Sequence, residues 1–490
     1  MAAMVPLLLR LVACLCFCFC GALAAPAFLR PPLTHSLSHS PDDYYVTKQP
    51  FWFSQRLDHF ASQDRRAFPQ RYYHFQSFFD RPHSGPIFLR ICGEGTCSGI
   101  SNDYLVVLAK QFGAAIVCLE HRYYGESSPF KELTTDNLKY LSSKQALFDL
   151  ASFRNFYQDL VNKQFNRTTG EDNPWFVFGV SYPGALSAWF RLKFPHLVRG
   201  SLASSGVVLA VHNYTAFDEQ VAASAGPACA SALREVTRRV DIELASNPVK
   251  IKSLFGAEQL KNDGDFRYLL ADAAAEAFQY GNPDILCLPL VAAHTPGQDV
   301  VDAYAEFVKT FFFGTFGASP QGYNQEYLKL TKSGPDSGDR QWWYQVCTEV
   351  AYFQVAPSKN SIRSPGVDEK YHLDLCANVF GNGTYPEVDI TNLYYGGSGI
   401  TATNIFFTNG SQDPWRHASK QKSSPGEPAI IMTCHNCGHG SDLRGCPQSP
   451  FQIQGDATKC AKPNEVHKAR QQIAEFIHML LHKGETTFTL

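Results

Sequence analysis

The chain has 490 residues, of which 44% are hydrophobic and 18% are charged. This composition is sufficient for a large buried core, and the length indicates two structural units rather than one. The formal net charge of −2 gives no reason to expect nucleic acid or another polyanion as a partner.

The N-terminus has the pattern of a secretory signal peptide. One basic residue, Arg10, precedes an apolar core over residues 11–19, and Ala22-Leu23-Ala24 offers a small-residue cleavage site. A retained membrane anchor is the alternative, but the apolar run is too short to span a bilayer comfortably. We therefore expect residues 1–24 to be removed, no membrane segment in the mature chain, and a protein that is secreted or delivered to a lysosome or vacuole.

Cysteines and glycosylation sequons agree with that route. Four of the 15 cysteines lie in the signal peptide, and most of the other eleven are expected to form disulfides. An odd count leaves at least one free thiol, and Cys118 is the candidate because it lies in a buried-looking strand. N-glycosylation is expected at Asn166, Asn213 and Asn382. A fourth sequon, at Asn409, is doubtful because it would lie beside the expected active site.

Strands and helices alternate along most of the chain after a leader rich in Pro, Ser and His. Residues 51–60 and 71–79 are expected to form a hairpin. Several later runs are continuously apolar, which is typical of parallel strands covered on both faces. The expected strands are 86–91, 114–119, 175–178, 200–205, 404–408 and 428–432, and the expected helices are 103–112, 142–164, a helix from 185 onward, and 465–482.

The pattern becomes helical between about residues 211 and 389, with few strand-like segments. Examples are residues 219–240, 265–279 and 299–313, whose apolar positions have a helical period. The alternation elsewhere predicts a mostly parallel sheet with helices on both faces. We therefore expect one α/β domain in two parts, 25–210 and 390–490, interrupted by a helical insertion over 211–389.

Residues 175–184 form the stretch most directly connected with chemistry. A short apolar strand runs into a turn and a helix, with Ser181 at the corner, where its hydroxyl would be exposed as a nucleophile requires. In the usual G-x-S-x-G pattern Gly179 fills the first glycine position, but Pro183 fills the second. Proline is acceptable in a first helical turn, and the Tyr182 N–H would point at an oxyanion. An ordinary strand–helix turn is the alternative.

A serine hydroxyl needs a base and an acid that orients the base. On a sheet of this kind they come later in the chain, the acid first and the histidine second, at the ends of late strands. Asp413 lies in a tight turn after strand 404–408, and His439 lies in a glycine-flanked loop after strand 428–432. Because the three features occur in the required order, the sequence predicts a triad of Ser181, Asp413 and His439.

Two further polar clusters allow other interpretations. The last loop could hold a metal ion, although disulfides would satisfy its cysteines in an oxidising compartment, so we expect no metal. After strand 114–119, Glu120, His121 and Glu126 could supply acid–base chemistry, but we expect a satisfied polar network under the edge of the sheet. The candidate metal ligands are Cys434, His435, Cys437, His439, Cys446 and Cys460.

Together these motifs identify a family. Over nearly the whole mature chain, the sequence resembles the prolylcarboxypeptidase, dipeptidyl-peptidase II and thymus-specific serine protease family of lysosomal or secreted serine peptidases. No single motif is specific enough alone, but their combination is. The matching segments are residues 55–60, 93–95, 120–127, 141–147, 179–184, 409–415 and 438–444.

The resemblance implies an α/β-hydrolase fold with a helical cap inserted between the sixth strand and the last two. It implies Ser181 as nucleophile, Asp413 as acid and His439 as base, with no cofactor. Family members cleave near a chain terminus, preferably after proline, and Trp415 matches a tryptophan that lines the proline pocket. The chain departs from the family at Gly440, where many members have a second histidine. Further candidate pocket aromatics are Trp342, Trp343 and Tyr344.

We therefore expect a serine peptidase that trims peptides near a terminus through an acyl-enzyme, with a preference for proline. The oxyanion would be held by the Tyr182 N–H and by a second N–H in the loop Gly93-Glu94-Gly95. An esterase or lipase on the same fold and a catalytically silent binding protein are the alternatives. Peptides are the expected partners, and both the recognised terminus and the existence of a homodimer are open at this point.

Overall fold

A computed structural model describes most of the chain. None of the helices in the described ranges is long and apolar enough to cross a membrane. The expected signal peptide, residues 1–24, lies outside these ranges, as do Cys446 and Cys460. The described residues are 45–167, 172–280, 282–294, 299–332, 334, 338–444 and 464–482.

An eight-stranded sheet forms the centre of the molecule, in the order β10-β9-β8-β7-β4-β6-β3-β2. β2 and β3 form the predicted hairpin, β3 is also antiparallel to β6, and all other neighbours are parallel. A separate pair, β1 (Tyr45–Thr47) and β5 (Ile100–Ser101), was not predicted. The strands of the large sheet are β2 (Phe51–Arg56), β3 (Ala67–Phe75), β4 (Ile87–Ile91), β6 (Ala115–Leu119), β7 (Trp175–Val180), β8 (Gly200–Ser204), β9 (Ile405–Gly410) and β10 (Ala429–Met432).

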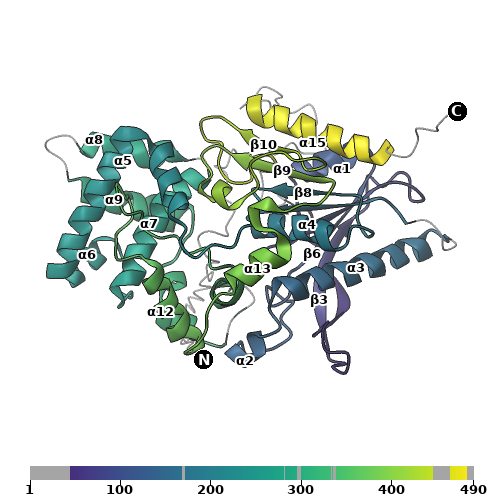
Figure 1. Ribbon diagram of the computed structural model, residues 1–490, viewed down its shortest axis with the longest axis horizontal. Coiled ribbons are helices and arrows are strands. Elements are labelled where there is room, and N and C mark those ends of the chain that lie inside the picture. The colour runs from purple at the N-terminus through teal and green to yellow at the C-terminus, as the bar shows by residue number, and fades with distance from the viewer. Residues whose placement is uncertain are drawn as a thin grey trace, which may run out of the picture.

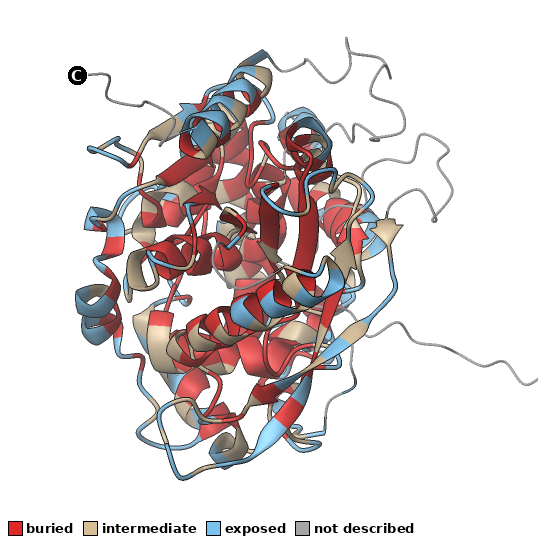
Figure 2. Cartoon of the chain, turned by 90° about the vertical axis from the view of Figure 1, so that its right-hand side faces the viewer, coloured by how far each residue is buried: buried red, intermediate tan, exposed pale blue. Residues whose placement is uncertain are grey.

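Helices cover both faces of this sheet, because its strands are apolar on both sides (Figures 1 and 2). In β4, Phe88 packs in one core with residues of α1 and α15, whereas Ile87 and Leu89 belong to the core on the opposite face. This alternation follows from the two-residue period of a strand. The flanking helices are α1 (Tyr104–Phe112) and α15 (Asn464–His482) on one face, and α3 (Ser143–Gln164) and α4 (Tyr182–Lys193) on the other.

A long helical segment, called the cap from here, connects β8 to β9. Figure 1 shows its helices α5 to α9 gathered in a lobe beside the sheet. Its place in the chain agrees with the insertion expected over 211–389, although its last helix ends at Tyr395; the division into domains stays an interpretation. The main helices are α5 (Thr215–Ser246, kinked at Gly226), α6 (Pro248–Leu254), α7 (Asp263–Gln279), α8 (Pro283–Ala293), α9 (Val300–Phe307), α11 (Asp339–Gln345), α12 (Glu369–Phe380) and α13 (Val388–Tyr395).

Four disulfides stabilise the described chain, and Cys118 is free and buried in β6, as predicted. Burial raises the pKa of the Cys118 thiol to about 12, so this cysteine is unreactive at physiological pH. The disulfides are Cys92–Cys97, Cys229–Cys287, Cys347–Cys376 and Cys434–Cys437.

The predicted glycosylation positions differ in accessibility. Asn166, Asn213 and Asn382 are exposed, and glycosylation there stays a prediction. Asn409 is completely buried, and its amide donates a hydrogen bond of 3.1 Å to the Lys420 carbonyl. A glycan could not be attached to Asn409 without disrupting this packing, which agrees with the doubt raised by its position in the sequence.

Candidate active site

Ser181 occupies a sharp turn between β7 and α4. Its backbone has φ 68° and ψ −129°, a conformation that non-glycine residues rarely adopt. Hydrogen bonds of 3.0 Å hold it on both sides, from the Ser181 N–H to the Ser204 carbonyl and from the Ala185 N–H to the Ser181 carbonyl. Such strain persists only where the surroundings enforce it, and it is concentrated at functional sites.

The residues around the turn explain its unusual sequence. A Cβ on Gly179 would lie 2.0 Å from the Pro183 carbonyl oxygen, so no side chain fits there. A Cβ on Gly184 would lie 2.8 Å from the Ser204 carbonyl oxygen, which makes glycine necessary one position later than the usual pattern places it. The turn therefore accommodates Pro183 because the close backbone approach occurs at Gly184.

Asp413 and His439 form the acid–base pair that the sequence predicts. His439 Nδ1 lies 2.8 Å from Asp413 Oδ2, and the other carboxylate oxygen accepts the Trp415 N–H at 2.9 Å. Both side chains are buried. Because a carboxylate only accepts, Nδ1 carries the hydrogen, and in the neutral ring Nε2 is the atom free to accept a proton.

The histidine loop lies directly against the serine turn. The Gly440 N–H donates a 2.9 Å hydrogen bond to Ser205 Oγ, and a Cβ on Gly440 would lie 2.6 Å from the side chain of Val180, the residue before Ser181. Gly440 also has φ +65°, so the second histidine of the resembled family would be strained here. The backbone thus brings the ends of β7, β9 and β10 to one site.

Among the described residues, His439 Nε2 is buried and has no hydrogen-bond partner. The predicted contact between Ser181 Oγ and this nitrogen is therefore not formed in this conformation. Catalytic hydrogen bonds are often long before substrate binds and become short in the complex. The nucleophile–base contact stays a prediction, while the base–acid contact is present.

The loop expected to complete an oxyanion site lies beside the same turn. A Cβ on Gly93 would lie 3.0 Å from the Pro183 ring, so the backbone of residues 93–95 is in contact with the start of α4. Tyr182 is the first residue of that helix, where backbone N–H groups have no partner within the helix. The next residue of the loop, Glu94, is buried, and burial raises the pKa of its carboxyl to about 7.

A buried network fixes the side chain of Tyr182. His121 Nδ1 lies 2.8 Å from the Arg122 carbonyl and must donate to it, so Nε2 accepts from the Tyr182 hydroxyl at 3.2 Å. Gln345 Nε2 donates to the same hydroxyl at 2.8 Å. Burial lowers the pKa of His121 to about 4, which keeps the ring neutral. Gln345 was not predicted, because nothing in its local pattern marks it.

The neighbouring Glu120 belongs to a second satisfied network, as expected from the sequence. Its carboxylate accepts hydrogen bonds from Arg71 at 2.6 Å, Ser127 Oγ at 2.7 Å and the Cys97 N–H at 2.9 Å. With these partners Glu120 connects β3, Cys97 and the loop after β6, and its two carboxylate oxygens are already occupied.

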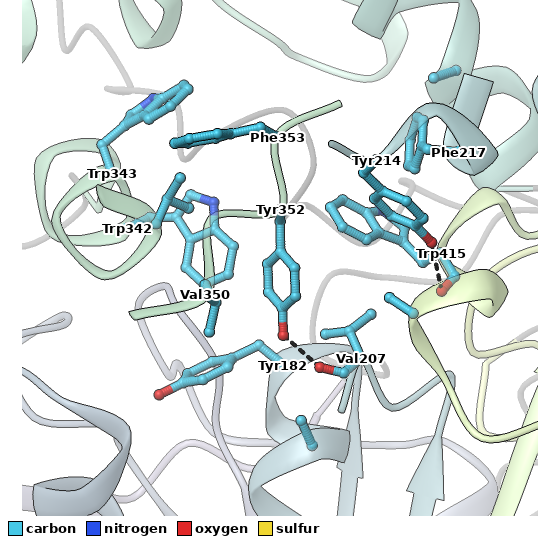
Figure 3. Packing of buried hydrophobic residues seen from close by; sticks show 14 of the residues in the cluster. Tyr182, Val207, Tyr214, Phe217, Trp342, Trp343, Val350, Tyr352, Phe353 and Trp415 are labelled. Atoms are coloured by element: carbon cyan, nitrogen blue, oxygen red, sulfur yellow. Dashed lines mark hydrogen bonds between the residues drawn. The ribbon is translucent and has the colours of Figure 1, made fainter. Parts of the chain in front are cut away.

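The three predicted pocket tryptophans, Trp342, Trp343 and Trp415, line one cavity. Figure 3 shows Trp342 and Tyr352 standing above Tyr182, with Phe353 and Trp343 farther into the cap. The cavity measures only about 10 Å³, room for roughly one water molecule. The aromatic pocket is therefore assembled but closed, and a substrate side chain could enter only if these rings moved.

Helix α7 of the cap connects this pocket to the histidine loop. The Gln279 carbonyl accepts the His439 N–H at 2.6 Å, and Gln279 Oε1 accepts the Trp415 indole N–H at 2.9 Å. A Cβ on Gly438 would lie 2.2 Å from the Gln279 carbonyl oxygen. The sequence pattern places Gln279 at the end of a helix but gives no indication of this contact.

The structure also bears on the metal-site interpretation. Cys434 and Cys437 form a disulfide, which removes both as thiolate ligands. Within the described residues no group of three or more histidine, cysteine, aspartate or glutamate side chains is placed to hold a metal ion.

The strand order, the strained serine after β7, and the acid and histidine after the last two strands define the class of protein as an α/β-hydrolase. The model of the serine carboxypeptidase S28 family matches residues 55–454. The chain belongs to this family and is a serine peptidase of the exopeptidase type, which confirms the resemblance seen in the sequence.

Relatives in plants and animals carry corresponding names. The chain is 54% identical over 450 residues to the probable serine protease EDA2 of Arabidopsis thaliana, covering 92% of this chain and 91% of the relative. It is 32% identical to the thymus-specific serine protease of Mus musculus, covering 81% and 82% of the two chains. It is 26% identical to the lysosomal Pro-X carboxypeptidase of Mus musculus, covering 84% and 87%.

Proposed function

We propose that this peptidase cleaves short peptides near a terminus, with Ser181 as nucleophile, His439 as general base and Asp413 as the acid that orients the base. The observation that carries the proposal is the buried Asp413–His439 pair, whose Nε2 is unbonded and lies in a loop packed against the strained serine turn. An imidazole held in this tautomer can accept a hydroxyl proton.

The reaction follows from these positions. His439 takes the Ser181 proton as Oγ bonds to the peptide carbonyl carbon, and it then gives that proton to the leaving amine. The negatively charged oxygen is held by the Tyr182 N–H and an N–H of the Gly93–Glu94 loop, and losing one such donor costs about 10²–10³ in rate. Water, deprotonated by the same histidine, then attacks the acyl-enzyme and releases Ser181.

We propose that the aromatic cavity confers a preference for proline. Trp342, Trp343 and Trp415 present flat apolar faces in one place, and a pyrrolidine ring buries its apolar surface there without leaving a side-chain donor unpaired. Relatives named Pro-X carboxypeptidase agree with this choice. The disulfides of the described chain and the lysosomal names of those relatives support a location in the secretory pathway, with secretion or a lysosomal or vacuolar destination.

The first test uses a fluorophosphonate probe together with a substrate panel. We expect the wild type and the exposed-serine control Ser246→Ala to be labelled and to cleave proline-containing peptides, whereas Ser181→Ala does neither. Labelling with hydrolysis of acyl esters alone would assign an esterase. An unlabelled wild-type protein that binds peptides without cleaving them would assign a silent binding protein.

The second test concerns the cavity. Trp342→Ala is expected to lower kcat/KM for a peptide with proline at the cleavage site about tenfold more than for its alanine counterpart, because the lost ring surface contacts only the larger side chain. The matched control is Trp52→Ala, a half-exposed tryptophan on β2, which should change neither value. Equal losses on both peptides would contradict the assignment of the cavity to proline.

A further inference from the structure

One face of helix α7 runs from the aromatic cavity to the histidine loop. At one end Tyr268 lines the cavity, and at the other Gln279 bonds to the His439 N–H. Glu276 lies between them on the same face, since residues separated by three, four or eight positions are stacked along a helix. Glu276 is therefore placed between the proposed substrate pocket and the catalytic loop.

The carboxylate of Glu276 has no partner in this conformation. The side chain is fully buried, and neither of its oxygens accepts a hydrogen bond. Both oxygens therefore belong to the buried side-chain atoms of the described residues that have no partner. One turn away, Asp272 accepts the hydroxyl hydrogen of Tyr323, so the neighbouring acid is satisfied within the protein. A buried acid without a donor is unfavourable unless something else supplies one.

The surroundings of Glu276 favour a cation from outside. Burial raises the pKa of its carboxyl well above the ordinary value, the charge of Asp272 raises it further, and the charge of Arg444 lowers it. Arg444 does not bond to Glu276; its guanidinium stacks on the Tyr280 ring at 4.5 Å. An ammonium group placed against Glu276 would supply the missing hydrogen bonds and stabilise the ionised carboxylate.

We propose that Glu276 binds the α-ammonium group of the substrate, so that this peptidase recognises the amino terminus of a peptide. The assignment rests on the proposed function and names the terminus on which the enzyme acts. A terminal carboxylate would offer Glu276 no hydrogen-bond donor and would bring a negative charge into a site that already holds the buried carboxyl groups of Glu276 and Asp272. The buried cation Arg363 of the cap is already paired with Asp218 at 3.2 Å. The family description names the opposite terminus, and Arg444 is the cation that would serve it, so the test distinguishes the two.

The experiment compares three forms of one proline-containing peptide: free at both ends, N-acetylated, and C-amidated. For the wild type we expect acetylation to lower kcat/KM on the order of 10- to 100-fold, the effect of losing hydrogen bonds to a charged group, and amidation to change it little. Glu276→Gln should lose the same factor on the free peptide and cleave the acetylated peptide as the wild type does. Glu258→Gln removes an exposed charge from the same cap and should behave as the wild type.

Several outcomes would overturn the assignment. Equal cleavage of the free and acetylated peptides by the wild type would do so, and a loss on amidation would assign the terminal carboxylate instead. If Glu276→Gln lowered kcat/KM equally for all three peptides, Glu276 would act only as a counterion of Arg444 and not as a ligand of the substrate. A fourth, acetylated peptide carries a lysine. If it is cleaved as well as the free peptide, Glu276 recognises a basic side chain of the substrate rather than its α-ammonium group. If the wild type cleaves none of the peptides although the probe labels Ser181, the proposed function itself fails, and the assignment of Glu276 falls with it.

Discussion

Replacing Gly179 by alanine tests whether the serine turn is as tightly determined as its geometry indicates. The added Cβ would lie 2.0 Å from the Pro183 carbonyl oxygen and 2.2 Å from its carbon, whereas ordinary contacts begin near 3.4 Å. More than an ångström must therefore open between the end of β7 and the first turn of α4. β7 is paired with β4 on one side and β8 on the other, so the strand cannot yield.

The displacement falls on α4, whose first residue is Tyr182. Moving a catalytic group by about 1 Å can cost about 10²-fold in rate, and overpacking of this kind typically costs about 1–3 kcal/mol of stability. We expect Gly179→Ala to react with a fluorophosphonate at least about 10²-fold more slowly than the wild type and to unfold at lower denaturant concentration.

The control is Gly399→Ala, because a Cβ at that position would meet no atom within 4 Å. Both variants would be purified, their unfolding in urea measured, and their rates of probe labelling compared. Wild-type labelling by Gly179→Ala would show that the turn can relax without moving the nucleophile, and the steric argument for this motif would then be wrong.

Three further changes have defined expectations. Asp413→Asn cannot hold the imidazole in the Nδ1–H tautomer, so kcat/KM should fall about 10³–10⁴-fold on peptide substrates, with the melting temperature reported alongside. Converting Cys434 and Cys437 to serine opens a disulfide with a sequence separation of 3, two residues before the proposed general base His439. Its chain-entropy contribution is only about 1–2 kcal/mol, so activity should fall more than stability. Glu94→Gln removes an acid whose pKa is raised by burial to about 7. The protonated carboxyl of Glu94 adds to the free energy of unfolding below the pKa that Glu94 has in the unfolded chain. This contribution is lost as pH rises through about 7, where the carboxyl ionises in the folded protein. Between pH 5 and pH 8 the wild type should therefore lose free energy of unfolding that the variant keeps. In urea unfolding, this difference between the two proteins should approach about 3 kcal/mol.

Each of these changes has an outcome that would contradict it. Near-normal turnover by Asp413→Asn would remove this residue from the triad. The disulfide Cys229–Cys287 closes a separation of 58 residues and is worth about 4 kcal/mol on the same model. Replacing both cysteines of this second disulfide by serine should lower stability more than activity. The reasoning would be refuted if this variant lost mainly activity and the Cys434/Cys437 variant lost mainly stability. Parallel pH profiles for the wild type and Glu94→Gln would mean that this acid is already ionised in the folded protein at pH 5.

The elements that the sequence predicted well are those whose pattern is local. Strands β4, β6, β7 and β9 were recognised because each contains a continuous apolar run, and a parallel strand covered by helices on both faces requires such a run. β8 was recognised as a run of small residues after the serine turn and its helix. The triad candidates were recognised because a nucleophile turn, an acid and a histidine each follow a strand in a fixed order. The short pair β1 and β5 was missed, since two- and three-residue strands have no measurable period.

The tertiary structure decided how distant faces meet. The periodicity of α7 shows that the helix is buried, but not that Gln279 contacts His439, nor that Glu276 is left without a partner. The Gln279–His439 contact joins residues 160 positions apart, and a local pattern encodes burial without specifying the neighbour. The same holds for the three tryptophans, which the sequence supplies and only the packing of the cap against the sheet brings around one cavity. Local hydrophobic periodicity thus determined the scaffold, and the motifs at strand ends determined the order of the proposed triad residues, whereas long-range packing determined which polar groups have no partner inside the protein.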